Sequence, residues 1–142
     1  ILDLKENKES GLNYYKRKIK EELEKWDLKN CDIITIVPSS KQNKVGEGLV
    51  SLVKSISEDY NIEYIQCLNR NRDVKKKANG GLRSRQLELD TIDAINIERI
   101  EGANILLFDD VTTTGTSLNS TREILYANGA NKVVCIALGK TV

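Results

Sequence analysis

The sequence predicts an α/β fold, a Rossmann-like parallel sheet flanked by helices. Several short segments are apolar almost throughout rather than alternately apolar and polar, which is typical of strands buried on both faces. These segments lie at 33–37, 62–68, 105–108 and 132–138. Helical patterns come between several of them, and strands that alternate with helices favour a parallel sheet. Ligands of such sheets bind beyond the carboxyl ends of the strands.

The first predicted element is an amphipathic helix over residues 12–28. Its apolar side chains recur at steps of three and four: Leu12, Tyr15, Ile19, Leu23 and Trp26. Lys and Glu fill the other face, where the spacings Lys18–Glu22 and Lys20–Glu24 suit ion pairs on a solvated surface.

The strand predicted at 33–37 ends at Pro38, and a polar loop leads into a helix that begins near residue 49. Residues 69–86 differ from their surroundings, because they are rich in Lys and Arg, lack apolar periodicity and contain a Gly80-Gly81 pair. We expect a long mobile loop there.

A weakly patterned bridge over 92–100 leads to the clearest strand, 105–108. A helix is expected from about Leu118 to Ala127, with Asn128-Gly129 as its stop. We expect one domain over 1–142, with a helical segment at about 1–30 and a core at about 31–142.

The amino-acid composition limits the classes of function that the chain can have. Lys and Arg number 22 against 21 Asp and Glu, which argues against a nucleic-acid or membrane footprint along the whole chain. No apolar run is long enough to span a bilayer, and no signal peptide is visible, although a start at Ile1 without any Met indicates a trimmed chain or a fragment. Three dispersed cysteines suit a reducing cytoplasm. Without histidine, the chemistry must use carboxylates, hydroxyls, basic side chains and backbone amides.

The segment ILLFDDVTTTGTSL, 105–118, carries the chemistry. Asp109 and Asp110 follow a strand, and a run of Thr, Gly and Ser then opens a helix. Backbone N–H groups at a helix start bind anions, and Gly115 permits positive φ and close approach. A phosphate in the loop beside two acceptors for hydroxyls suits a sugar phosphate. The alternative is an ordinary helix cap, since Ser and Thr are favoured there.

The segment FDDVTTTGTSL resembles the signature of type I phosphoribosyltransferases that binds phosphoribosyl pyrophosphate (PRPP). More closely, CDIITIVPSSK, the basic middle segment and DDVTTTG resemble the ComF-like, competence-associated branch. The resemblance covers most of the chain from about Leu12, although the basic segment shares only its composition. The zinc-binding N-terminal module common in that branch is absent.

This resemblance implies specific roles. Asp109 and Asp110 would hold the ribose hydroxyls, with Asp110 the candidate base for the acceptor. The 5′-phosphate loop would comprise Thr113, Thr114, Gly115, Thr116 and Ser117. The pyrophosphate loop would comprise Ser39, Ser40 and Lys41; a plain solvated turn is the alternative. A flexible basic loop with Arg70, Arg72, Arg83 and Arg85, beside Lys75, Lys76 and Lys77, would close over the site, or contact nucleic acid.

The implied reaction transfers the 5-phosphoribosyl group of PRPP to a nitrogen base and releases pyrophosphate. Mg²⁺ would be held mainly by PRPP, with no direct protein ligand. A non-catalytic module that senses PRPP or nucleotides, and an accessory protein of DNA uptake or nucleic-acid handling, remain as alternatives. We expect no membrane partner, and a homodimer is left open.

Overall fold

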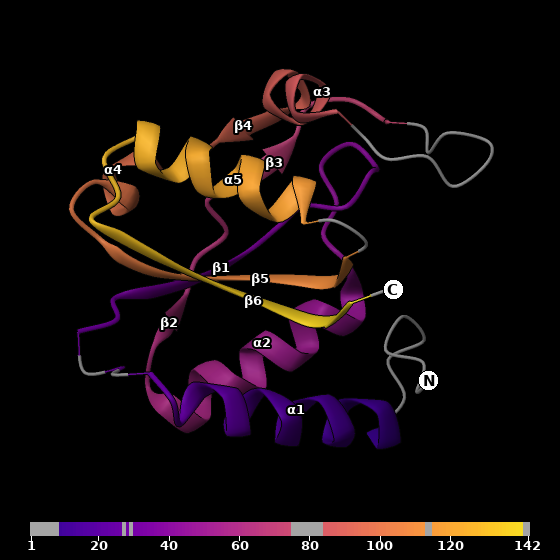
Figure 1. The fold of residues 1–142 in the computed structure, drawn as a ribbon, viewed down its shortest axis with the longest axis vertical. Coiled ribbons are helices and arrows are strands. Elements are labelled where there is room, and N and C mark those ends of the chain that lie inside the picture. Colours follow the sequence, from indigo (N-terminus) through magenta and orange to yellow (C-terminus); the bar gives the residue numbers. More distant parts are fainter. Residues whose placement is uncertain (1–8, 27, 29, 75–83, 113–114, 141–142) are drawn as a thin grey trace.

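The computed structural model describes residues 9–26, 28, 30–74, 84–112 and 115–140. Its centre is a parallel sheet in the order β2-β1-β5-β6 (Figure 1). The strands of this sheet are β1 (Ile33–Ile36), β2 (Glu63–Tyr64), β5 (Asn104–Thr112) and β6 (Lys132–Lys140). The predicted α/β architecture with a parallel sheet is therefore confirmed.

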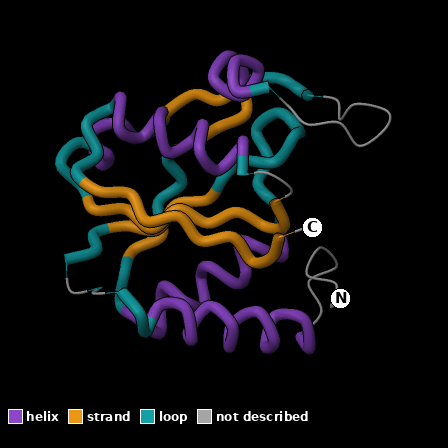
Figure 2. The backbone as a smooth tube through the Cα atoms, in the orientation of Figure 1, coloured by secondary structure: helices purple, strands orange, loops and turns teal. Residues whose placement is uncertain are grey.

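Helices cover both faces of the sheet (Figures 1 and 2). The helices α1 (Glu9–Leu23) and α2 (Glu47–Tyr60) cover one face, and α5 (Thr116–Ala127) covers the other. Leu106 and Phe108 of β5 pack in the core beneath α1 and α2, whereas Leu107 packs in the core beneath α5. None of the described helices is long and apolar enough to cross a bilayer.

A second, two-stranded antiparallel ribbon lies beyond α5. It pairs β3 (Leu68–Arg70) with β4 (Ile92–Ala94), and the helices α3 (Arg85–Thr91) and α4 (Ile97–Ile100) flank β4 in the chain. The strand β4 of this ribbon and the helix α3 pack against α5 (Figure 1). Residues 92–100, predicted as a weakly patterned bridge, thus contain the strand β4 and the short helix α4.

The first helix is shorter than predicted. It ends at Leu23, and the Trp26 side chain is 43% exposed instead of facing the core. The Lys20 ammonium pairs with Asp59 of α2 at 2.8 Å, not with Glu24. Packing of α1 on α2 therefore replaces the ion pair that was expected within the helix.

The predicted strand 62–68 is divided in two. Ile65 still donates its N–H to the carbonyl of Ile34, but the Gln66 side-chain amide then donates to the carbonyls of Ile36 and Leu68. This side chain satisfies backbone acceptors where the chain leaves one sheet and enters the other. A side-chain amide can replace the ladder in this way, which the apolar pattern does not reveal.

The cysteines are free in this fold. Cys67 is buried, and Cys31 and Cys135 are partly exposed. Burial raises the pKa of the Cys31 thiol, and likewise that of the Cys67 thiol, to about 11. Both are protonated near neutral pH and serve as small core groups.

Candidate functional site

The winding of the sheet changes direction between β1 and β5. From β1 the chain crosses through α2 to β2 on one side, and from β5 it crosses through α5 to β6 on the other. Ile36, the last residue of β1, pairs with Phe108, directly before the two aspartates. Ligands of open parallel sheets bind outside the carboxyl ends of the strands at such a switch point. The candidate site therefore lies between the segments that follow β1 and β5.

The acidic pair lies within β5. The sequence had suggested instead that the two aspartates follow the strand. Because β6 continues alongside, Asp109 pairs with Ala137 and the ladder extends to Thr112 and Lys140. Successive side chains of a strand lie on opposite faces. Asp109 therefore shares the α5 face with Leu107, and Asp110 lies on the opposite face.

The two carboxylates also differ in exposure. Asp109 is 9% exposed, and one of its carboxylate oxygens, Oδ1, accepts the backbone N–H of Asp110 at 2.8 Å. Asp110 is partly exposed. Asp110 is consequently the more accessible of the two to a ligand at this edge.

The start of α5 has the geometry predicted for an anion site. Gly115 is the N-cap residue, with φ +79°, and its carbonyl accepts the N–H of Asn119 at 2.8 Å. Gly115 supplies no side-chain cap to α5, and backbone N–H groups at a helix start favour anions. Thr113 and Thr114 lie outside the described residues.

The segment after β1 forms a compact loop, residues 39–44. The Ser39 N–H donates to the carbonyl of Lys44 at 3.0 Å, and the Ser39 hydroxyl accepts the N–H of Lys41 at 3.1 Å. The Ser40 carbonyl accepts the N–H of Val74 at 2.8 Å. Ser39 and Ser40 are partly exposed and Lys41 is exposed, so the three predicted residues share one ordered loop at the carboxyl edge.

Arg70 does not belong to a mobile loop, contrary to the prediction. It ends β3, its side chain is 0% exposed, and its guanidinium donates to the Ser39 carbonyl at 2.9 Å. A second nitrogen of the guanidinium donates to Glu88 at 3.1 Å and to the Thr91 hydroxyl at 2.7 Å. These α3 partners could not be predicted from the sequence, because neither Glu88 nor Thr91 stands in an apolar or motif pattern. Arg70 is part of the buried framework beneath the loop.

The remaining basic residues divide among different settings. Arg72 is exposed after β3, whereas Arg85 is the first residue of α3 and makes two hydrogen bonds to Glu123 of α5, at 2.8 and 2.6 Å. The predicted loop therefore does not extend to residues 69–70 or 85–86, because local pairing places them in β3 and α3. Arg83 and the lysines 75–77 lie outside the described residues.

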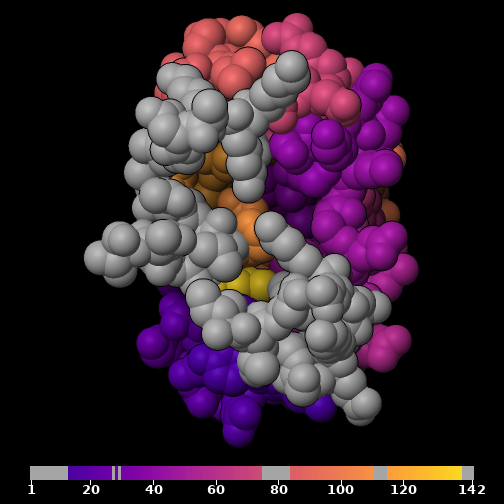
Figure 3. Space-filling model, turned by 90° about the vertical axis from the view of Figure 1, so that its right-hand side faces the viewer, coloured from indigo at the N-terminus to yellow at the C-terminus, as the bar shows by residue number. Residues whose placement is uncertain are grey.

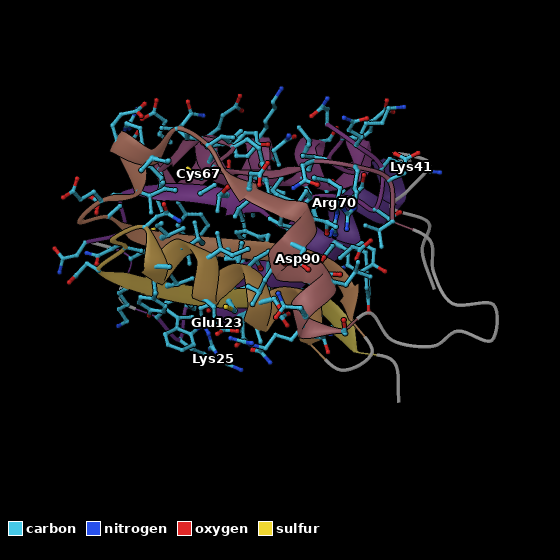
Figure 4. The ribbon with its side chains drawn as sticks, turned by 90° about the horizontal axis from the view of Figure 1, so that it is seen from above. Lys25, Lys41, Cys67, Arg70, Asp90 and Glu123 are labelled. Atoms are coloured by element: carbon cyan, nitrogen blue, oxygen red, sulfur yellow. The ribbon has the colours of Figure 1, made fainter. Side chains whose placement is uncertain are left out.

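Figure 3 faces the carboxyl edge. Orange atoms of β5 lie beside the purple atoms of the segment after β1 and above the yellow atoms of β6. Figure 4 shows Arg70 between the α3 ribbon and this segment, with Lys41 at the outer edge. Within the described part of the chain, no group of three or more Cys, Asp or Glu side chains is arranged to hold a metal ion.

Solved structures similar to this chain include phosphoribosyltransferases and a glutamine PRPP amidotransferase. The glutamine PRPP amidotransferase of B. subtilis matches 87% of this chain with a TM-score of 0.57 at 19% identity. A hypoxanthine phosphoribosyltransferase of Staphylococcus aureus matches 96% with a TM-score of 0.55 at 15% identity. An adenine phosphoribosyltransferase (APRTase) of Giardia lamblia matches 94% with a TM-score of 0.60 at 11% identity. The chain has the type I phosphoribosyltransferase fold.

The extent of these matches differs. The chain spans 26% of the amidotransferase, 65% of the hypoxanthine enzyme and 81% of the Giardia enzyme. No protein-family model and no curated protein matches the sequence significantly. Loop 39–44 follows β1, and the start of α5, residues 115–117, lies after β5, so both segments lie beside the switch point.

Proposed function

We propose that this chain binds PRPP and transfers its 5-phosphoribosyl group to a nitrogen base, with release of pyrophosphate. The observation that supports this most is the meeting of three features at one switch point. These are the glycine-capped start of α5, the carboxylates of β5 and the ordered loop 39–44. The glutamine PRPP amidotransferase shares this fold, which supports the same function.

Each feature has a part in the proposed complex. The 5-phosphate binds the N–H groups that follow Gly115, where the helix dipole favours negative charge. The carboxylates of Asp109 and Asp110 accept hydrogen bonds from the ribose hydroxyls. The pyrophosphate lies toward Ser39, Ser40 and Lys41.

The reaction breaks the bond between C1 of the ribose and the pyrophosphate oxygen and forms a bond from C1 to nitrogen. Positive charge that develops at C1 is stabilised by the nearby carboxylates, and Lys41 offsets part of the charge of the departing pyrophosphate. Asp110, the more exposed carboxylate, is placed to accept a proton from the acceptor.

A divalent cation fits this site. PRPP would supply its main ligands, because a hard cation such as Mg²⁺ prefers oxygen ligands, and no direct protein ligand is assigned. Mg²⁺ bound with PRPP would neutralise the pyrophosphate. Membership of the ComF-like branch is proposed from the resemblance of the sequence segments, and a cytoplasmic location is proposed from the three free cysteines.

The test compares wild type with Asp110→Asn, which keeps the shape of the side chain and removes its charge. Loss of one charge-assisted hydrogen bond implies about 1.5–3 kcal/mol, or about ten- to a hundredfold weaker PRPP binding. If the carboxylate also stabilises charge at C1, pyrophosphate release with a panel of bases slows more than binding weakens.

Asp93→Asn is the control, because Asp93 is an exposed aspartate of β4 in the other sheet. Wild-type PRPP binding without pyrophosphate release from any base would exclude the transferase and leave a sensor. Equal effects of the two substitutions on binding would exclude Asp110 from the site.

A further inference from the structure

The orientation of one peptide group in the loop 39–44 follows from a buried hydrogen bond. The Ser39 carbonyl and the Ser40 N–H belong to the same planar trans peptide, so they point in opposite directions. The carbonyl accepts from the buried Arg70 guanidinium at 2.9 Å. The Ser40 N–H therefore points away from the protein interior. Among the hydrogen bonds of the described residues, this N–H has no acceptor.

The guanidinium that sets this orientation is itself fixed on several sides. Glu88 and Thr91 of α3 accept from its Nη1 nitrogen. The backbone of Arg70 is held as well, since its carbonyl accepts the N–H of Asn43 at 3.0 Å. The Thr91 hydroxyl donates to the carbonyl of Leu87, which directs its oxygen lone pairs toward Arg70. A rigid planar fork makes such contacts together, and a single flexible ammonium does not.

The charge of Arg70 is balanced inside the protein. Glu88 is also 0% exposed and its carboxylate lies 3.1 Å from the guanidinium. The Arg70 side chain is buried with its carboxylate partner. Arg70 therefore affects a ligand through the loop and not by direct contact.

We propose that Arg70 is a positioning residue that holds the Ser39–Ser40 peptide so that the Ser40 N–H donates to a pyrophosphate group. This inference rests on the proposed function, since pyrophosphate is the group released from PRPP. The new element is the role of Arg70, which supports the loop from beneath and does not belong to a loop that closes over the site.

The test is Arg70→Lys, which keeps the positive charge beside Glu88 and removes the fork that reaches Ser39. Calorimetry with inorganic pyrophosphate and Mg²⁺ should show binding about tenfold weaker than in wild type, which is about 1.4 kcal/mol. Binding of ribose 5-phosphate, directed to the start of α5, should change less than about twofold. Arg99→Lys is the matched control, because Arg99 pairs with the exposed Glu63 at 2.6 Å.

Unchanged pyrophosphate affinity in folded Arg70→Lys would overturn the proposal, as would an equal loss of affinity for both ligands, which indicates general disruption. If Arg70→Lys does not fold, titration of the ¹⁵N-labelled wild type with pyrophosphate decides. A saturable shift of the Ser40 amide resonance supports the proposal, and an unmoved resonance overturns it. A wild type that binds neither ligand overturns the proposed function as well, whereas ribose 5-phosphate binding without the Arg70 effect overturns this inference alone.

Discussion

Replacing Gly115 with valine tests whether the start of α5 binds phosphate, provided that its effect on ligand binding is compared with its effect on stability. Gly115 has φ +79° and Gly102 has φ +74°, a region that β-branched residues rarely adopt. A Cβ at Gly115 would meet nothing nearer than Asn119 Nδ2 at 3.7 Å, and one at Gly102 would have no atom within 4 Å. Neither added Cβ causes a clash, so the strain of the left-handed backbone is expected to be the main cost of both substitutions, about 1–3 kcal/mol.

Ligand binding should distinguish the two variants. Relief of strain at Gly115 rotates the N–H groups that open α5, whereas Gly102 directly precedes the core segment at the amino end of β5. Loss of one charge-assisted hydrogen bond to phosphate weakens binding by about ten- to a hundredfold. Urea unfolding measures the cost in stability, and calorimetry with ribose 5-phosphate measures affinity. Equal affinity in folded Gly115→Val and Gly102→Val would refute the placement of the phosphate at α5.

Two other expected outcomes concern stability. Glu88→Ala leaves the Arg70 charge buried without this carboxylate and should lower the free energy of unfolding in urea by about 3–5 kcal/mol. Glu63→Ala, at an exposed pair, should lower it too little to measure. Similar losses of stability in the two variants would show that the Arg70–Glu88 pair contributes little. Unfolded thiols ionise near pH 9.0, but burial holds the pKa of Cys31 and Cys67 at about 11. The unfolded state therefore loses protons first, and stability should fall between pH 9 and 11. A smaller fall is expected in Cys31→Ala, and an unchanged pH dependence in that variant would contradict the assignment.

The strands of the central sheet could be predicted because burial on both faces leaves an apolar run in the sequence. The runs at 33–37, 105–108 and 132–138 all became strands of that sheet. The predicted end of the helix at Asn128-Gly129 is also confirmed, since α5 ends at Ala127 and Gly129 has φ +97°. Such signals are local, so they can be read without knowing the tertiary structure.

The errors arose where distant residues decide the structure. Arg70 stands in a basic sequence, and its burial depends on Glu88 and Thr91 of a different helix and on a carbonyl of the 39–44 loop. The extension of β5 through Asp109 and Asp110 depends on pairing with β6. Charge composition predicted exposure, but a paired and hydrogen-bonded arginine can be buried. The sequence could predict that the acidic pair and the loop 39–44 lie at one edge of the sheet. It could not predict the buried Arg70 contacts that support the loop.

The central claim is that PRPP binds at the switch point between β1 and β5. Titration of the ¹⁵N-labelled chain with PRPP and Mg²⁺ tests it most directly, because amide resonances report both affinity and location. We expect saturable shifts for Ser40, Asp110, Thr116 and Ser117, and none for Gly102 at the opposite edge. Saturation without these shifts, or no binding of PRPP at all, would contradict the account.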